Sequence, residues 1–198
     1  MNIFRREQTP NYKVMGFIDG SNLLIELSKE LKIKFRADKP PLPVLSIALL
    51  LINHLFNAYG KTPIRKYWFA SYQGNDEDHM TYAKELRRLT FEPVLFKNNN
   101  GKEKGVDIAL ATEMLVNAFN QNYDIGVIVA GDKDYVGLVK EVKRYGAIIH
   151  GAFFEHGLSV DLALSVDKFH DIIKNDNINF EAEPWAKYVS EVKNWGKT

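Results

Sequence analysis

The sequence contains no cysteine among its 198 residues. This absence excludes disulfide bonds, thiolate nucleophiles and zinc sites built on sulfur. The sequence also lacks a large excess of either charge, since 26 basic and 25 acidic residues give a formal net charge of +1. A basic field over the whole surface, of the kind that some nucleic-acid-binding proteins use, is therefore not indicated, and any site for a polyanion has to be a local patch.

Long apolar runs are missing as well. The most apolar stretch, residues 44–56, is interrupted by polar side chains, and it is shorter than the roughly 20 residues that cross a bilayer. The first 13 residues are polar and have no apolar core of the kind found in secretion signals. Because 45% of the residues are hydrophobic, the chain can still bury a core. We expect a soluble cytoplasmic protein with no membrane partner.

Strand-like and helix-like segments alternate along the chain. The predicted strands span residues 13–18, 64–72, 92–96, 125–130, 147–154 and 169–173, and the predicted helices span residues 22–33, 44–59, 76–89, 106–119, 133–145 and 159–164. This alternation favours an α/β fold, a three-layer α/β/α sandwich with a mainly parallel central sheet.

The composition changes after Lys174, which predicts a domain over residues 1–174 and a C-terminal tail over residues 175–198. Within the tail, apolar residues recur at helical spacing and predict a short amphipathic helix. We expect this helix to pack back on the domain. A contact in a homodimer and a surface that stacks bases are the alternatives.

Acidic residues follow several predicted strands. One segment, VIVAGDKDY at residues 127–135, places two aspartates directly after an apolar strand. In a parallel sheet, sites form outside the carboxyl ends of the strands. If the first strand and the strand at 125–130 are neighbours, four carboxylates meet at this edge. These residues are Asp19, Asp107, Asp132 and Asp134.

Such a cluster suits a hard divalent cation, Mg²⁺ or Mn²⁺, because these ions prefer oxygen ligands and keep several waters. A bound cation offsets the repulsion among the carboxylates, polarises a phosphate oxygen and helps to form hydroxide from water. Ser21 and Asn22 directly follow Asp19 and can add neutral oxygens. The pattern therefore indicates phosphodiester hydrolysis.

Each of these acids also has a purely structural interpretation. Asp19 can cap the helix that follows it, and Asp107 can be a first-turn acid favoured by the helix dipole. Asp132 can cap the helix that starts at Lys133, with Asp134 in its first turn. All four structural roles at one sheet edge are less probable than any one of them alone.

Four segments, in this order, resemble the NYN domains of the PIN-like nuclease group, and most closely their LabA-like branch. They are FIDGSN at 17–22, KGVDIALATEML at 104–115, VIVAGDKDY at 127–135 and SVDKF at 165–169. The resemblance implies a PIN-like sheet in the order 3-2-1-4-5. It also implies Mg²⁺- or Mn²⁺-dependent ribonuclease chemistry, with metal-binding acids at Asp19, Asp107, Asp132 and Asp134.

An RNA substrate needs cations along its path. Lys102 and Lys104 lie in the polar loop before Asp107 and are candidate phosphate contacts or solvated surface residues, and Tyr135 is a candidate residue at the mouth of the site. Aromatic residues of the second strand can stack bases or pack in the core. They are Trp68, Phe69 and Tyr72.

The sequence thus predicts a metal-dependent ribonuclease whose catalytic and metal-binding residues are the four aspartates, with RNA as its partner. Ser21, Asn22, Lys102, Lys104 and Tyr135 are the predicted substrate contacts. The alternative is a non-catalytic module that binds RNA or protein and retains the acidic pocket. A third interpretation, a phosphoryl-transfer enzyme with an aspartyl nucleophile, is weakened because Asp19-Gly20-Ser21 lacks the second acid that such phosphatases use.

Overall fold

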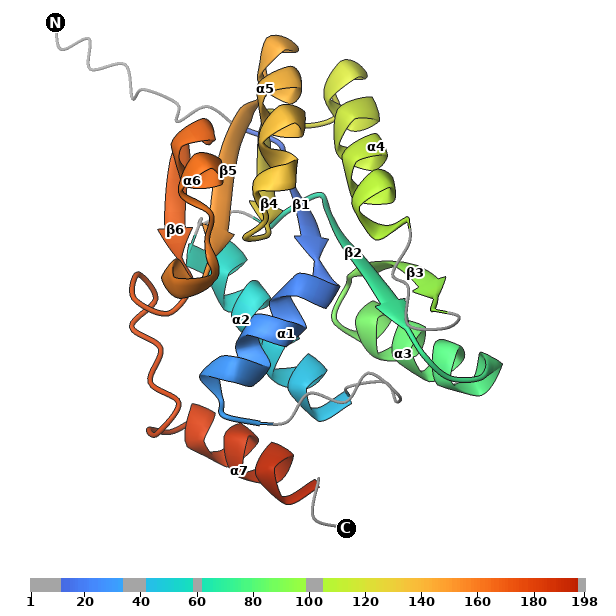
Figure 1. Cartoon of the computed structure of the whole chain (residues 1–198), viewed down its shortest axis with the longest axis vertical. Coiled ribbons are helices and arrows are strands. Elements are labelled where there is room, and N and C mark those ends of the chain that lie inside the picture. The colour runs from blue at the N-terminus through green and yellow to red at the C-terminus, as the bar shows by residue number, and fades with distance from the viewer. Residues whose placement is uncertain (1–11, 34–41, 59–61, 99–104, 196–198) are drawn as a thin grey trace, which may run out of the picture.

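A six-stranded parallel sheet forms the centre of the molecule. The computed structural model describes residues 12–33, 42–58, 62–98 and 105–195. The strands within these ranges lie in the order β3-β2-β1-β4-β5-β6, and each neighbouring pair is parallel (Figure 1). They are β1 (Val14–Asp19), β2 (Arg65–Tyr72), β3 (Glu92–Lys97), β4 (Ile125–Val129), β5 (Ile148–Phe153) and β6 (Lys168–Asp171). The order 3-2-1-4-5 is confirmed, and β6 extends it by one strand.

Helices cover both faces of this sheet. They are α1 (Gly20–Glu30), α2 (Leu42–Ala58), α3 (Asp76–Arg88), α4 (Val106–Phe119), α5 (Val136–Arg144), α6 (Val160–Ser165) and α7 (Trp185–Trp195), with short 3₁₀ helices η1 (Lys133–Tyr135) and η2 (Glu155–Gly157).

Alternation along the strands creates two hydrophobic cores, because successive strand residues point to opposite faces. Ile18 belongs to a core that includes residues of α1, α2, α3 and α7, whereas its neighbour Phe17 belongs to a core that includes residues of α4, α5 and α6. The three-layer α/β/α architecture is therefore confirmed.

β1 lies at the centre of the sheet, between β2 and β4. All six of its residues are buried, and Ile18 is in register with Val129 of β4. The first strand and the strand at 125–130 are therefore neighbours, as the convergence of the acids requires. The strand order reverses between β1 and β4, which is the position where open α/β sheets bind ligands.

Two helix starts differ from the predicted ones for a local reason. The first helix begins at Gly20 because Asp19 accepts the cap hydrogen bond from the backbone of Asn22. The helix predicted over 133–145 begins as η1, and the α-helix proper starts at Val136. In both cases an aspartate at the end of a strand sets the start of the next helix.

α7 packs through Val189 and Val192, which are 6% and 5% exposed and belong to the same core as α2. Ile172, Ile178 and the α7 residues Val189 and Val192 belong to this one core. The division at residue 174 stays a prediction.

Candidate functional site

Asp19 ends β1 and is buried at the carboxyl edge of the sheet, with 5% of its surface exposed. Its Oδ1 accepts a hydrogen bond of 2.9 Å from the backbone N–H of Asn22. An aspartate is a preferred helix cap, and this bond fixes the direction of the carboxylate. The second oxygen, Oδ2, is the one that takes part in the contact described next.

Tyr135 brings two of the predicted acids together. Its hydroxyl oxygen lies 2.9 Å from Oδ2 of Asp19 and 2.9 Å from Oδ1 of Asp107, in the first turn of α4. A phenol carries one hydrogen, so it donates to one of these oxygens at a time. The two carboxylates therefore carry more negative charge than this hydroxyl compensates, which favours a cation at the same position.

Burial and the two neighbouring carboxylates raise the pKa of Tyr135 far above its usual value. The phenol therefore stays protonated at neutral pH and acts as a hydrogen-bond donor. Its ring is only 3% exposed, so it does not present a face on which a base can stack. The sequence predicted Tyr135 near the site but not the contact of its hydroxyl with two carboxylates. The sequence feature that could have indicated this contact is a hydroxyl-bearing residue directly after Asp134.

Asp132 and Asp134 lie in the turn that follows β4. Oδ1 of Asp132 accepts a hydrogen bond of 3.0 Å from the backbone N–H of Asp134, so Asp132 caps η1. Both side chains are exposed, and η1 ends at Tyr135. The same three-residue helix thus carries Asp134 and the hydroxyl that contacts the other pair of acids.

Ser21 and Asn22 connect the start of α1 to the strands on either side of β1. The Ser21 Oγ accepts a hydrogen bond of 3.0 Å from the backbone N–H of Ser71, at the end of β2. The Asn22 Oδ1 accepts one of 2.9 Å from the backbone N–H of Gly131, in the turn after β4. These side chains were predicted to contact substrate, and the structure gives each an additional role in positioning the edge of the sheet.

Gly131 is required by close packing around the turn. A Cβ at this position would lie 2.2 Å from the backbone oxygen of Gly157, at the end of η2. The Gly131 oxygen in turn accepts a hydrogen bond of 2.8 Å from the backbone N–H of Ser159. The segment between β5 and α6 therefore supports the acidic turn from outside.

The carboxylate oxygens of Asp19 and Asp107 are donors of the kind that magnesium and manganese ions prefer. Across the described ranges, no three His, Cys, Asp or Glu side chains are grouped so as to hold a metal ion. A group of three is not required, because Mg²⁺ in phosphoryl-transfer sites is bound through one or two carboxylates while waters and substrate phosphates complete its shell. The oxygens of Asp19 and Asp107 that each lie 2.9 Å from the Tyr135 hydroxyl oxygen are two donors of this kind.

The remaining predicted RNA contacts are two lysines and three aromatic residues. Lys102 and Lys104 lie outside the described residues. Trp68, Phe69 and Tyr72 are buried, at 0%, 1% and 9% exposure, and so pack in the core.

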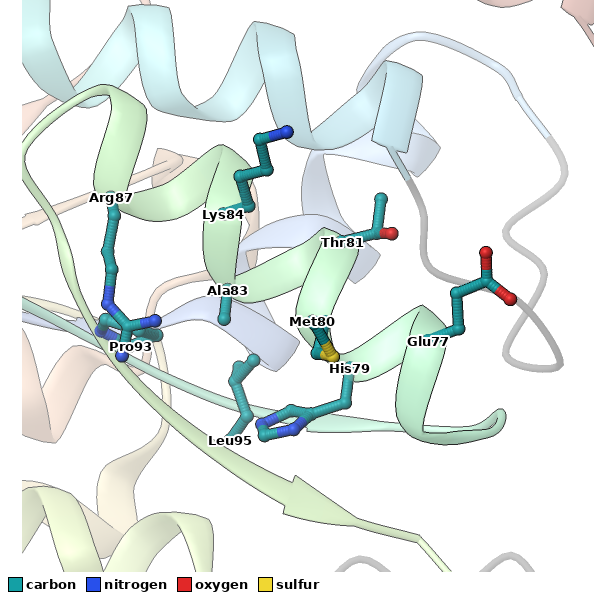
Figure 2. A pocket seen from close by; sticks show the side chains of 9 residues that line it. All are labelled: Glu77, His79, Met80, Thr81, Ala83, Lys84, Arg87, Pro93 and Leu95. Carbon is teal, nitrogen blue, oxygen red and sulfur yellow. The ribbon is translucent and has the colours of Figure 1, made fainter.

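Two of the surface hollows are lined in part by basic side chains. The larger, about 720 Å³, lies between α3 and β3 and is called here the α3–β3 hollow. Figure 2 shows Arg87, Met80 and His79 directed from α3 toward Pro93 and Leu95 of β3. None of the four aspartates lines it. The smaller, about 510 Å³, is lined by residues of η1, α5 and α6, including Asp134, and is called here the α5–α6 groove.

The parallel sheet and its acidic edge define a PIN-like α/β domain. The family model named NYN domain matches residues 13–174, so the chain belongs to the NYN domain family. NYN domains are generally nucleases, and membership supports a nuclease function for this chain. Its place in the LabA-like branch stays a prediction.

One of the solved structures that match this chain does so over most of its length. It is a protein of unknown function, VPA0982, from Vibrio parahaemolyticus RIMD 2210633, with a TM-score of 0.60 and 17% sequence identity. The match covers 80% of this chain and 91% of that one, and at this identity it shows the fold alone. No curated protein matches.

The described helices include none with the length and apolar character needed to span a bilayer. The cytoplasmic location and the homodimer stay predictions.

Proposed function

We propose that this protein is a metal-dependent ribonuclease that hydrolyses RNA phosphodiester bonds at the carboxyl edge of its sheet. The observation that supports this most directly is the meeting of Asp19 and Asp107 at the Tyr135 hydroxyl. Two carboxylates from distant segments, one of them buried, are costly to keep together unless a cation offsets their charge. Membership of the NYN family supports the same class of chemistry.

In this proposal Asp19 and Asp107 hold Mg²⁺ or Mn²⁺, which when bound polarises a phosphate oxygen and lowers the pKa of a water. Asp132 and Asp134 lie exposed in the adjacent turn. From there they orient the attacking water or complete the ligand set as substrate arrives. Tyr135 keeps its proton and bridges the carboxylates of Asp19 and Asp107 when no cation is bound. Asn22 fixes the turn relative to Asp19.

The alternative, a non-catalytic module that binds RNA or protein, is favoured by one observation. Within the described part of the chain, the acids do not form a ready three-ligand group. The two functions differ in their response to a chelator. A binding module keeps its affinity and produces no cleavage, whereas the nuclease loses cleavage when the metal is removed.

The test is cleavage of an end-labelled single-stranded RNA with Mn²⁺, with Mg²⁺ and with EDTA. We expect cleavage with either metal and none with EDTA. Asp107→Asn and Asp132→Asn are each expected to abolish cleavage, since each keeps the shape of the side chain and removes its charge. Asp76→Asn is the matched control because the Asp76 side chain is 95% exposed and lies on α3. Cleavage by folded Asp107→Asn at the wild-type rate would refute the proposal.

A further inference from the structure

The α5–α6 groove joins the acidic edge of the sheet at Asp134. This residue lines the groove together with Lys133 of η1 and Lys140 of α5, and Asp161 and Leu164 of α6 lie among its other lining residues. The groove therefore begins at a predicted catalytic residue and continues along the first turns of α5. Any chain bound across the acidic edge has this hollow directly beside it.

Two lysines of the groove are free to bind an external anion. Within the described residues, neither Lys133 nor Lys140 forms an ion pair, and both side chains are exposed. The next basic residues of α5 differ, because Lys143 pairs with Asp167 at 2.7 Å and Arg144 with Glu141 at 3.0 Å. The basic residues at the end of α5, Lys143 and Arg144, are thus neutralised by acids. Lys133 and Lys140, which line the groove next to Asp134, are left available.

The two lysines are spaced to bind different phosphates of one strand. Lys133 lies in η1 and Lys140 in α5, so their separation of seven residues corresponds to about 10–12 Å along the helix axes, and both side chains line the same groove. On the opposite wall Leu164 is 80% exposed. An exposed aliphatic side chain facing two cations offers a surface for the sugar or base of a nucleotide whose phosphates the lysines hold.

We propose that the α5–α6 groove binds single-stranded RNA on one side of the cleaved bond, with Lys133 and Lys140 contacting its phosphates. The proposal rests on the proposed ribonuclease function and specifies where its substrate lies. Asp161 limits the affinity because its carboxylate lines the same groove and repels phosphate. Duplexes are disfavoured, since a hollow between two helices admits one strand more readily than two.

The test is fluorescence anisotropy with a short labelled single-stranded RNA in EDTA, where no cleavage occurs, at several salt concentrations between about 50 and 200 mM. Each phosphate contact contributes about 0.7 to the slope of log affinity against log salt for single strands. We expect the variant carrying Lys133→Gln and Lys140→Gln to bind more weakly, with a slope smaller by about 1.4. Asp161→Asn is expected to bind more tightly than the wild type.

The matched control carries Lys84→Gln and Arg87→Gln, two basic residues of the α3–β3 hollow (Figure 2). We expect this variant to bind RNA as the wild type does. Three results would each overturn the proposal that the groove binds RNA. They are an unchanged slope in the Lys133 and Lys140 variant, no RNA binding by the wild type, and a loss of binding seen only in the α3 variant. Metal-dependent cleavage by the wild type is measured separately. The failure of the RNA-binding proposal and the failure of the proposed ribonuclease function can therefore be distinguished.

Discussion

The side-chain oxygen of Asn22 accepts a hydrogen bond from the backbone N–H of Gly131, joining the start of α1 to the turn after β4 across 109 residues of sequence. This bond fixes the acidic turn relative to Asp19, which precedes Asn22 by three residues. A single amide thus sets the relative positions of acids that come from two different strands.

Asn22→Ala is expected to lower both stability and cleavage. The variant leaves the buried N–H of Gly131 without its acceptor, which costs about 1–3 kcal/mol in the free energy of unfolding. Ser28→Ala is the control, because it removes a buried hydrogen bond of the same helix, from the Ser28 Oγ to the backbone oxygen of Leu24, and leaves the acidic turn in place. Chemical denaturation and the RNA cleavage assay measure the two effects. Equal loss of cleavage in both variants would show that the turn is positioned by other contacts.

Tyr135→Phe is expected to bind the divalent cation more tightly than the wild type does. Without the hydroxyl, nothing competes with a cation for Oδ2 of Asp19 and Oδ1 of Asp107. In EDTA the variant loses roughly 1 kcal/mol of stability, and Mn²⁺ then raises its melting temperature by more than it raises that of the wild type.

Tyr123→Phe is the control for this measurement, because the Tyr123 hydroxyl donates to the neutral backbone oxygen of Met114 at 3.0 Å. It should lose stability in EDTA but show the same response to Mn²⁺ as the wild type. If all three proteins respond equally to the metal, the Tyr135 hydroxyl does not occupy the position of the cation.

The general placement of the site was predictable from the sequence because it follows from topology. Strands at 13–18 and 125–130 in a parallel sheet have their carboxyl ends at one edge, whatever the details of packing. The bounds of α4, Val106–Phe119, agree with the sequence prediction to the residue, since its apolar pattern begins right after Gly105. The ordered motifs supplied the strand order, which local patterns alone do not determine.

The contacts within the site were not predictable in the same way. The bond between Tyr135 and Asp19 joins side chains 116 residues apart, and it depends on the direction of each side chain to within a fraction of an ångström. Ser21 and Asn22 stay predicted substrate contacts, and the hydrogen bonds that their oxygens accept from backbone N–H groups were not predicted. Only the packed structure determines which polar partner a cap residue finds. The three-residue helix η2 was too short for any periodic pattern to indicate it.

Gly131→Ala is expected to destabilise the protein by about 1–3 kcal/mol, since the new methyl group overlaps the backbone oxygen of Gly157. Gly137→Ala, six residues away in α5, should have the opposite effect. A Cβ at Gly137 meets nothing within 4 Å, and alanine is favoured over glycine inside a helix by up to about 1 kcal/mol. Thermal denaturation of the two variants compares them directly, and a neutral Gly131→Ala would contradict the close packing of η2 on the turn.

Lys66 provides a pH-dependent contribution to stability outside the site. It lies 6% exposed in β2, and burial lowers its pKa from 10.5 to about 8. Its Nζ donates to the backbone oxygen of Leu89 at 3.0 Å. Between pH 8 and pH 10.5 the unfolded chain holds this proton and the folded chain does not, so this group makes stability rise with pH in that window.

Lys66→Met removes the titrating group, so its stability lacks this rise. We expect the free energy of unfolding of the wild type, relative to Lys66→Met, to increase by roughly 1–2 kcal/mol between pH 8 and pH 10. Urea denaturation of both proteins at matched pH values gives this difference. A constant difference over the window would mean that the Lys66 pKa is the same in the folded and unfolded chains.

The most direct test of the shared cation is calorimetric titration of Mn²⁺ into the wild type, Asp19→Asn, Asp107→Asn and the control Asp76→Asn. We predict saturable binding by the wild type and by Asp76→Asn, and a loss of at least most of that affinity in the other two variants, with all four proteins folded by circular dichroism. Equal Mn²⁺ binding by the wild type, Asp19→Asn and Asp107→Asn, or none by any folded protein, would contradict a cation held between these two carboxylates.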